Sequence, residues 1–466
     1  MKNYGEAREY LYGLHKRGIK MGLRNMRIMC RIFDNPQKKF RSVHVAGTNG
    51  KGSVACYTAS VLRKQGYRTG LYTSPHLLDY TERILVDEDP ITRDEILELA
   101  NFVEDRISAY NESCTDDGKR IAPTFFEVMT MICFLHFVRQ KVEVAVLEVG
   151  LGGRLDASNV VIPEVSTVIT IGLEHENWLG KGLKRIGREK AGVIKKGVPA
   201  VIGRLPEEAM LEADRAAEKQ GAPLFKLGRD FKLGGKNGDY SFSGCGMRIN
   251  RLKLDLPGAH QRDNAAIALA MLAILRAKGW EISKESIKSG MERMFWPGRL
   301  DRFGNNPPWI LDGAHNPAGI NALVDTIEEM FLQKRILTVF SFMRDKRIEE
   351  CVEPFRRLNT DWILTEPAVT RARSVEELFE HVSRLPGKVR RAKKVSAALR
   401  LAQELSPDYD LILLCGSLYL IGEAYERVSE KIGRAAESEI IFDRYPPIFL
   451  TADKKCQRIK LPGEVK

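Results

Sequence analysis

An apolar run that ends in a cluster of glycines, VHVAGTNGKGS at residues 43–53, constrains the fold of this chain more than any other stretch. Three glycines, a lysine and a serine fall within the seven positions from Gly47 to Ser53. Because glycine at this density destabilises the interior of a strand or helix, the segment predicts a tight turn. The stretch that follows, VACYTASVLRKQG, has helical spacing, and Gly66 is placed to end that helix. We therefore expect a strand, a glycine turn and a helix in this order.

The rest of the chain alternates strand-like apolar runs with helical segments. The runs that read as further strands are RTGLYTS, VEVAVLEVG, VSTVITIGLEH and VPAVIG. Strands that are apolar without interruption and are joined by helices favour a parallel sheet that is covered on both faces. Residues 224–256 differ, because short segments separated by glycine turns are better suited to small antiparallel strands.

A boundary is expected within FWPGRLDRFGNNPPW, residues 295–309, where proline, glycine and asparagine cluster. Beyond it WILDGAHNP, RILTVFSF, DWILTEP and DLILLCGSLYLIGE form a second series of strands. We therefore predict an α/β protein with a mostly parallel first domain over residues 1–296 and a smaller Rossmann-like α/β domain over residues 297–430. The tail, residues 431–466, receives no structural assignment.

The cysteines, the apolar runs and the N-terminus indicate the cellular compartment in which the chain is expected to act. Eight cysteines are scattered without any C-x-x-C pair, so we expect neither a disulfide framework nor a zinc site. The longest apolar run, residues 265–275, is shorter than the roughly 20 residues needed to cross a bilayer and predicts a buried helix. The N-terminus carries charges of both signs and does not resemble a secretory signal. We expect a cytoplasmic protein with no membrane partner.

The net charge of +12 attracts anions, either nucleic acid or small molecules. Local concentrations of basic residues, such as RRAKK at residues 390–394, are interpreted as solvated faces. No nucleic-acid module is recognisable, so we expect no nucleic-acid partner. Small anions remain the simpler explanation of the charge.

The glycine turn has a chemical use between a strand and a helix. Glycines allow backbone N–H groups to converge on phosphate oxygens, and the start of the helix at Ser53 adds partial positive charge. Lys51 would reach the β- and γ-phosphates, with Ser53 near a metal ion. The spacing departs from the usual Gly-x4-Gly-Lys-Ser, because Val45 stands at the expected first glycine and Gly52 separates Lys51 from Ser53. We interpret the turn as a nucleotide-binding loop of P-loop type, as in ATPases.

This variant of the loop resembles the ATP loop of the folylpolyglutamate synthases and bifunctional dihydrofolate synthases, members of the Mur ligase superfamily. Further segments resemble blocks of that family in the same order over residues 7–427: GIKMGLRNMRIM, LYTSPHLLDYTERI, LEVGLGGRLDASN, REKAGVIKKG, GAHQRDNAAIALA, WPGRLD, LDGAHNPAGI and GSLYLIGE. Each block alone is weak evidence, but the ordered set is specific.

The resemblance implies an ATP-dependent ligase that adds L-glutamate to a folate. A carboxylate of the pterin substrate would attack the γ-phosphate of ATP, and the amino group of glutamate would displace phosphate from the resulting acyl phosphate. Whether dihydropteroate is also an acceptor stays open. The family is often monomeric, and a monomer is expected here.

The resemblance implies two Mg²⁺ ions. Ser74 and Glu148 would hold one ion, and Glu148 with His175 a second. Glu148 also ends an apolar strand, where a carboxylate is costly unless it is paired or bound to metal, and a salt bridge is the alternative explanation. Lys190 matches a lysine that the family carbamylates, which would supply an anionic oxygen group near the metal. An ordinary helix lysine is the alternative.

The nucleotide-binding and catalytic residues are also implied by the resemblance. Asn264 would approach the adenine, Arg299 the phosphates and Asp312 the ribose. His315 would approach the γ-phosphate from the second domain. Closure of the domains would then complete the cluster of charges over the phosphates. The loop contributes Asn49, Gly50, Lys51, Gly52 and Ser53, and the catalytic set is Lys51, Lys190 and His315.

Two segments match those that hold the pterin substrate in the family. They comprise Thr124, Phe125, Phe126, Glu127, Arg154, Leu155 and Asp156. Aromatic faces such as those of Phe125 and Phe126 suit a flat ring, although a role in the helix core explains them at least as well. Arg83 would bind the substrate carboxylate or form an ion pair.

The chain departs from the family pattern at two positions, and other functions stay open. Glu174 stands where the family usually has Asp, and Gly182 where it usually has Thr, which leaves the geometry around His175 uncertain. A different Mur-type amino-acid ligase is an alternative, although TSPHL and GSLYLIGE argue against it. A nucleic-acid-stimulated ATPase is the alternative from another class.

Overall fold

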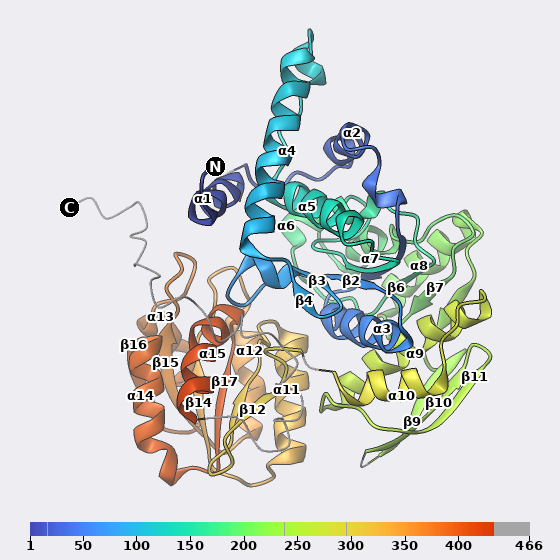
Figure 1. Ribbon diagram of the computed structural model, residues 1–466. Coiled ribbons are helices and arrows are strands. Elements are labelled where there is room, and N and C mark those ends of the chain that lie inside the picture. The colour runs from blue at the N-terminus through green and yellow to red at the C-terminus, as the bar shows by residue number, and fades with distance from the viewer. Residues whose placement is uncertain (16, 237, 295, 433–466) are drawn as a thin grey trace. The chain divides into compact units, whose positions relative to one another are not determined.

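The computed structural model describes residues 1–15, 17–236, 238–294 and 296–432 (Figure 1). The predicted tail lies outside the described residues from residue 433 onward. The chain forms two compact units: Met1–Arg299 with Asn316–Leu332, and Leu300–His315 with the chain from Gln333 onward. The division into domains at residues 1–296 and 297–430 stays a proposal.

The first unit is built on a sheet with the strand order β4-β3-β2-β5-β1-β6-β7-β8. The strands from β2 through β8 in this order run parallel, and β3 and β4 are antiparallel additions at one edge. The bounds are β1 (Arg41–Ala46), β2 (Thr69–Tyr72), β3 (Ile84–Val86), β4 (Asp89–Pro90), β5 (Val144–Glu148), β6 (Val165–Val168), β7 (Ala200–Ile202) and β8 (Leu224–Lys226). The prediction of a mostly parallel sheet is confirmed.

The first unit also contains eleven described α-helices. They are α1 (Tyr4–His15), α2 (Arg24–Ile32), α3 (Lys51–Gln65), α4 (Arg93–Ser113), α5 (Phe125–Arg139), α6 (Glu176–Leu179), α7 (Leu183–Ala191), α8 (Glu207–Gln220), α9 (Ala259–Ala277), α10 (Lys284–Glu292) and α11 (Pro317–Met330). Helix α3 begins directly after Gly50 and ends at Gly66, and both glycines have positive φ angles, 84° and 103°. The expected succession of strand, glycine turn and helix is therefore confirmed.

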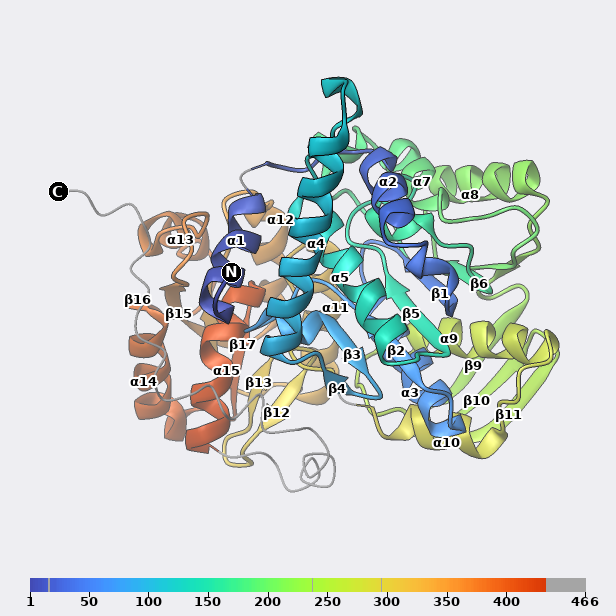
Figure 2. The same ribbon diagram turned by 45° about the horizontal axis from the view of Figure 1, so that its top comes forward.

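Alternate side chains of the central strands face two different cores. Val45 and Val146 pack with α3 and α9, whereas Leu147 packs on the other face with α5. Figures 1 and 2 show α3 and α5 on opposite faces of the sheet. Because both faces are covered, these strands are apolar without alternation.

A small antiparallel sheet packs against the core formed by α3 and α9. It consists of β9 (Phe231–Lys236), β10 (Asp239–Gly244) and β11 (Met247–Leu252), in the order β11-β10-β9. Small antiparallel strands were expected here, but Leu224–Lys226 pairs with the main sheet as β8 instead. The predicted buried helix at residues 265–275 lies within α9 and is buried throughout. No described helix is long and apolar enough to cross a membrane.

The second unit contains a sheet with the order β12-β13-β17-β14-β15-β16, parallel except for β12. Its strands are β12 (Asp301–Phe303), β13 (Trp309–Leu311), β14 (Ile336–Phe340), β15 (Thr360–Glu366), β16 (Val389–Lys394) and β17 (Leu411–Cys415). Its described helices are α12 (Ile348–Val352), α13 (Val375–Val382), α14 (Val395–Leu405) and α15 (Leu418–Ile432). The second α/β series is confirmed.

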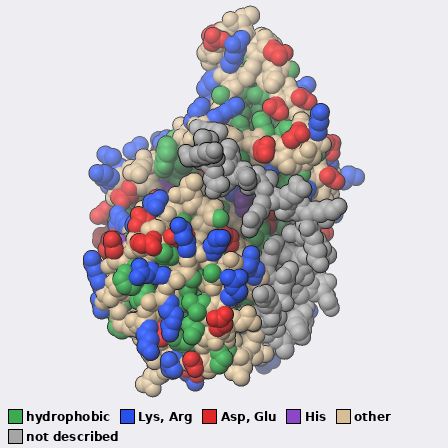
Figure 3. Space-filling model, turned by 90° about the vertical axis from the view of Figure 1, so that its left-hand side faces the viewer, with side chains coloured by type: hydrophobic (Ala, Val, Ile, Leu, Met, Phe, Trp, Pro, Cys, Tyr) green, Lys and Arg blue, Asp and Glu red, His purple; other side chains and the backbone are tan. Residues whose placement is uncertain are grey.

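The basic run at residues 390–394 forms most of β16, a strand that the sequence did not predict. It lies at the edge of the sheet, where charged side chains prevent pairing with another chain. On the face of the molecule in Figure 3, Lys and Arg side chains are scattered among acidic and apolar ones. Arg391, Lys393 and Lys394 of β16 are exposed, whereas Arg390 is half-buried, so the interpretation as a solvated basic segment is correct only in part.

Candidate active site

The predicted metal and phosphate residues follow four neighbouring strands. Ser74 follows β2, Glu148 ends β5, the glycine loop follows β1, and His175 lies beyond β6. These strands stand side by side in the order β2-β5-β1-β6, and they run parallel. Their carboxyl ends therefore meet at one edge of the sheet, which is the usual position of ligand sites in α/β folds.

The glycine loop is held from several sides. The backbone N–H of Thr48 donates to the carbonyl of Thr170 (2.8 Å), and the N–H of Asn49 donates to the Thr170 hydroxyl (3.0 Å). The Lys51 ammonium donates to the carbonyl of Thr48 (3.0 Å). The loop is therefore anchored on the segment after β6, and the Lys51 amine lies over the loop itself.

Two of the glycines are required by close packing. A Cβ atom on Gly50 would lie 2.4 Å from the Asn264 side-chain oxygen, and Gly50 has a φ of 84°. A Cβ atom on Gly52 would lie 2.8 Å from the indole nitrogen of Trp296. The additional glycine that breaks the usual loop spacing is thus explained by the indole that packs on it.

Helix α9 brings two amides to the start of α3. The Gln261 side chain donates to the Ser53 hydroxyl (3.3 Å), and the Asn264 side chain donates to Gln261 (2.9 Å). Ser53 and Asn264 are both buried. Asn264 therefore lies beside the loop with Ser53, although its predicted contact with adenine stays a prediction.

Glu148 is buried at the end of β5, with only 4% of its surface exposed. Its carboxylate accepts the backbone N–H of Ser74 (3.0 Å). Burial raises the pKa of Glu148, while the cations Lys51 and Arg299 oppose that rise. The structure therefore brings together Ser74, Glu148, Lys51 and Arg299, as the predicted site requires.

The donor set at this edge fits a Mg²⁺ ion. A buried carboxylate beside a serine offers the oxygen ligands that Mg²⁺ prefers, and a cation would offset the cost of burying the charge. Among the described residues, no group of three or more His, Cys, Asp or Glu side chains is arranged to hold a metal. Mg²⁺ often uses one or two protein carboxylates and completes its shell with water and phosphate.

His175 and the two departures from the family pattern lie together in the segment after β6. The His175 ring nitrogen Nε2 lies 3.7 Å from the Glu174 carboxylate. Gly182 has a φ of 88°, a conformation that favours glycine, and its N–H donates to Glu176 (3.2 Å). The backbone thus accounts for glycine at residue 182, and the role of His175 as a metal ligand stays a prediction.

Lys190 lies under the glycine loop rather than on an exposed helix face. It is 5% exposed, and its amine donates to the carbonyl of Gly47 (2.7 Å). Burial, with Lys51 nearby, lowers the pKa of Lys190 to about 7. The amine is therefore neutral in a large fraction of molecules near pH 7, which the alternative of an ordinary helix lysine does not explain.

The substrate segment at the start of α5 has a structural role of its own. Thr124 and Glu127 form a capping box, in which each side chain accepts the backbone N–H of the other residue. Phe125 is buried, stacks on His15 with ring centroids 4.0 Å apart, and lies 5.2 Å from the Arg83 guanidinium. Phe126 is half-buried.

Arg83 belongs to a buried aromatic and cationic cluster. Its Nε donates to His76 Nδ1 (2.9 Å), and its guanidinium lies 5.9 Å from the ring centroid of Tyr80. Burial and the Arg83 charge lower the pKa of His76 to about 3, so His76 is neutral. Arg83, Phe125 and Tyr80 thus combine a cation with flat apolar faces, which suits an anionic aromatic ligand.

The second substrate segment is a loop tied back on itself. Asp156 is buried, and its carboxylate accepts the N–H groups of Gly150 (3.1 Å) and Leu151 (3.0 Å) and the hydroxyl of Ser158 (2.5 Å). Arg154 pairs with Glu189 (2.8 Å), and Leu155 is half-buried. The hydrogen bonds of Asp156 shape the loop, and its contact with substrate stays a prediction.

Asp312 and His315 lie in the second unit. The Asp312 carboxylate accepts the N–H of Leu300 (3.0 Å) and the N–H of Ala314 (2.8 Å). His315 Nδ1 lies 2.8 Å from the carbonyl of Gly313, and a carbonyl only accepts, so Nδ1 carries the proton. Their contacts with nucleotide stay predictions.

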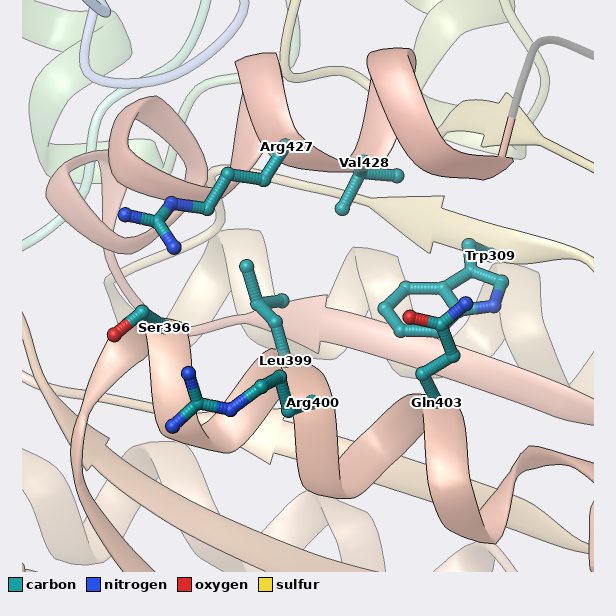
Figure 4. A pocket seen from close by; sticks show the side chains of 7 residues that line it. All are labelled: Trp309, Ser396, Leu399, Arg400, Gln403, Arg427 and Val428. Carbon is teal, nitrogen blue, oxygen red and sulfur yellow. The ribbon is translucent and has the colours of Figure 1, made fainter.

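A pocket in the second unit lies apart from these residues. Figure 4 shows its lining, which comprises Trp309, Ser396, Leu399, Arg400, Gln403, Arg427 and Val428. None of these lining residues is a predicted site residue, although Trp309 begins β13 and Asp312 directly follows the end of that strand.

Several residues of the site could not be selected from the sequence. Trp296 stands in the WPGRLD block, but nothing in its spacing shows that it packs on Gly52. Thr170, Gln261 and Asn316 contact the loop, yet polar residues beside a strand or helix are common. His15 and His76 complete the cluster around Phe125 and Arg83, and only their neighbourhood in space identifies them.

Comparison with known proteins places the chain in a family. The model of the Mur ligase, glutamate ligase domain matches residues 298–418. The dihydrofolate synthase/folylpolyglutamate synthase of Bacillus subtilis is 33% identical over 91% of this chain and 99% of its own length. The structure of E. coli FolC in complex with DHPP and ADP has a TM-score of 0.82 at 30% identity, and covers 92% of this chain and 98% of that one. The folylpolyglutamate synthase of Mycobacterium tuberculosis complexed with ADP has a TM-score of 0.83 at 28% identity, and covers 93% and 100%.

These relatives match both units. They are folate enzymes, which decides between that family and the alternative of another Mur-type amino-acid ligase. The similarity to the B. subtilis protein extends over nearly its whole length. The glycine loop, the buried glutamate and the second α/β unit lie in the order that the resemblance predicts. This chain belongs to the folylpolyglutamate synthase/dihydrofolate synthase family of Mur ligases.

Proposed function

We propose that this chain adds L-glutamate to the carboxylate of a folate, using ATP and an acyl phosphate intermediate. The observation that carries the proposal is the glycine loop, with Lys51 and Arg299 beside a buried Glu148. The relatives from E. coli and M. tuberculosis, whose structures contain ADP, support a nucleotide as the ligand of this loop.

In the first step, an oxygen of the folate carboxylate forms a bond to the γ-phosphorus of ATP, and the bond to the ADP oxygen breaks. Both reactants are anions, so their approach requires cations and oriented N–H groups. Lys51 and Arg299 supply positive charge, and the loop backbone at residues 47–53 supplies N–H donors. These groups stabilise the transferring phosphoryl group and the leaving ADP.

In the second step, the amine of glutamate attacks the acyl carbon. An amide C–N bond forms, the C–O bond to phosphate breaks, and the amine loses a proton. When the site closes around the phosphates, it excludes water. Water would otherwise hydrolyse the acyl phosphate. ADP and phosphate are the other products.

Ser74 and Glu148 would hold Mg²⁺, with His175 and Glu148 as the proposed second pair. When bound, the ion neutralises charge on the phosphate oxygens. The Ser74 N–H donates to the Glu148 carboxylate and thereby orients it.

We further propose that Lys190 is carbamylated. Its neutral amine would form an N–C bond to CO₂ and lose a proton, which yields an anionic carbamate. The burial of the amine and its contact with Gly47 support this assignment. Lys51, which disfavours a lysine ammonium at this position, favours an anion there.

Because only the neutral amine reacts with CO₂, ligase activity is expected to rise with pH through about 7, where Lys190 loses its proton. Activity is also expected to depend on bicarbonate in solutions freed of CO₂. A carbamate signal from ¹³C-labelled bicarbonate in the NMR spectrum should be present in the wild type and absent from Lys190→Ala. A wild-type spectrum without that signal would refute the modification.

The remaining predicted contacts belong to the same proposal. Arg83, Phe125 and Phe126 would bind the pterin substrate, with residues 150–156 as a second wall. Asn264 and Asp312 would bind the nucleoside, and His315 the γ-phosphate. We further expect a cytoplasmic monomer that acts without nucleic acid.

A pairwise acceptor assay tests the function. Labelled glutamate is supplied with ATP and either tetrahydrofolate or dihydropteroate, and product formation is measured for the wild type and for Lys51→Ala. We expect product with tetrahydrofolate, and its loss in Lys51→Ala because the phosphates lose their anchor. Product with dihydropteroate would identify a bifunctional enzyme. Absence of product with both acceptors would contradict the proposal.

A further inference from the structure

The tip of the glycine loop is joined to α11 by a reciprocal pair of side-chain amides. The Asn49 amide donates to the Asn316 side-chain oxygen (3.1 Å), and the Asn316 amide donates to the Asn49 side-chain oxygen (2.9 Å). Asn316 is 6% exposed, and both residues lie in the first unit. Two bonds of complementary direction therefore connect positions that are 267 residues apart in the chain.

The orientation of Asn316 is fixed independently of Asn49. Its side-chain oxygen also accepts the N–H of Gly319 (2.8 Å) and thereby caps the start of α11. The capping bond identifies the oxygen end of the amide, so the nitrogen end must face the Asn49 oxygen. A rigid helix end thus presents one donor and one acceptor to the loop.

The backbone of Asn49 is held on its other side by Thr170. The Asn49 N–H donates to the Thr170 hydroxyl (3.0 Å), which in turn donates to the Asn49 carbonyl (3.0 Å). With backbone and side chain both engaged, Asn49 has little freedom to change the shape of the loop. Its neighbour Gly50 is the N-cap residue of α3.

We infer that Asn316 is a positioning residue for ATP binding, which acts by holding Asn49 and hence the loop in the shape that accepts phosphate. This inference rests on the proposed function of the loop. It differs from the expected role of Asn49 as a direct nucleotide contact, because the Asn49 amide is already paired.

The variant Asn316→Ser tests the hydrogen bonds to Asn49 separately from the cap of α11. Asn316→Ser keeps an oxygen that caps α11 but is too short to reach Asn49. Asn321→Ser, an exposed position in the same helix, is the matched control. Asn49→Ala and the double variant Asn49→Ala/Asn316→Ser complete a double-mutant cycle.

Binding of ATP by calorimetry, KM for ATP and for folate, and the thermal midpoint are measured for each variant. We expect Asn316→Ser to weaken ATP binding and to raise KM for ATP, each roughly tenfold, since two hydrogen bonds are lost. KM for folate and the thermal midpoint should match those of Asn321→Ser. The double variant should lose no more affinity than Asn316→Ser alone.

Two results would overturn the inference: wild-type affinity for ATP in Asn316→Ser, or losses from Asn49→Ala and Asn316→Ser that add in the double variant. Equal increases in KM for ATP and folate, together with a lower thermal midpoint, would indicate a structural role and would also overturn it. If the wild type itself binds no ATP, the proposed function fails, and the inference fails with it.

Discussion

Single residues explain why the glycine loop departs from the usual spacing. Gly50 is required because its φ is positive and because the Asn264 side chain occupies the space of a Cβ atom. Gly52 is required because the Trp296 indole packs on it. The irregular spacing is thus a consequence of neighbours more than 200 residues away, which the sequence alone does not reveal.

A methyl group at Gly52 should disturb the loop. In Gly52→Ala the new Cβ would lie 2.8 Å from the Trp296 indole nitrogen, so the ring or the loop must move. We expect weaker ATP binding and a free energy of unfolding lower by about 1–3 kcal/mol, measured by calorimetry and urea titration. Gly13→Ala, in α1 with open space around it, is the control and should not weaken binding. Wild-type affinity in Gly52→Ala would show that Trp296 does not constrain the loop.

Asp255 is expected to make the stability of the fold depend on pH. Burial raises its pKa to about 6, and its carboxylate accepts the N–H of Met294 (3.0 Å). The folded state therefore binds more protons than the unfolded state between about pH 4 and 6, and stability falls as pH rises through that window.

Asp255→Asn removes this cost and keeps an oxygen for the Met294 N–H. We expect the free energy of unfolding to rise by about 3 kcal/mol at pH 8 and to change little near pH 4, measured by urea titration at both values. An equal change at both pH values would contradict the assigned pKa.

Helix termini illustrate how one motif supports two interpretations. The TFFE segment at residues 124–127 matches a substrate-binding block, and it is also a capping box at the start of α5. Sequence spacing alone could not separate these roles. The cap explains Thr124 and Glu127, whereas Phe125 remains available to the proposed substrate site through its contact with Arg83.

Loss of the cap should affect both stability and substrate binding. In Thr124→Ala, the N–H of Glu127 loses its acceptor, so we expect the free energy of unfolding to fall by about 1 kcal/mol. KM for folate should rise because Phe125 is the first residue of the helix, whereas KM for ATP should stay the same. Thr124→Ser retains a capping hydroxyl and should resemble the wild type. A fall in stability with unchanged KM for folate would separate the cap from the substrate site.

Elements with a strong apolar pattern were predicted well, and elements defined by pairing alone were not. The central strands β1 and β5 and the buried helix α9 are apolar enough to be recognised from the sequence. Strand β16 was missed because its basic side chains give no apolar signal, and only its pairing with β15 makes it a strand. Similarly, β8 joins the main sheet through pairing with β7, which its sequence does not specify.

For the whole chain, the fold class and the order of the two α/β series could be predicted because continuous apolar strands and helical connections repeat along it. The metal and phosphate residues could be proposed because they follow strands whose carboxyl ends meet at one edge. The residues that hold the glycine loop in place could not be predicted from the sequence. Asn316 holds Asn49 and Gln261 holds Ser53 across more than 200 residues, and no local pattern encodes such contacts.

The central claim is that ATP activates a folate carboxylate before glutamate attacks. It is tested by supplying a folate whose glutamate carboxylates are labelled with ¹⁸O, together with ATP and glutamate, and measuring the isotope content of the released phosphate. Formation and breakdown of an acyl phosphate transfers one carboxylate oxygen to phosphorus, so one ¹⁸O atom is expected in each phosphate released. Phosphate without ¹⁸O, released while product forms, would contradict the account.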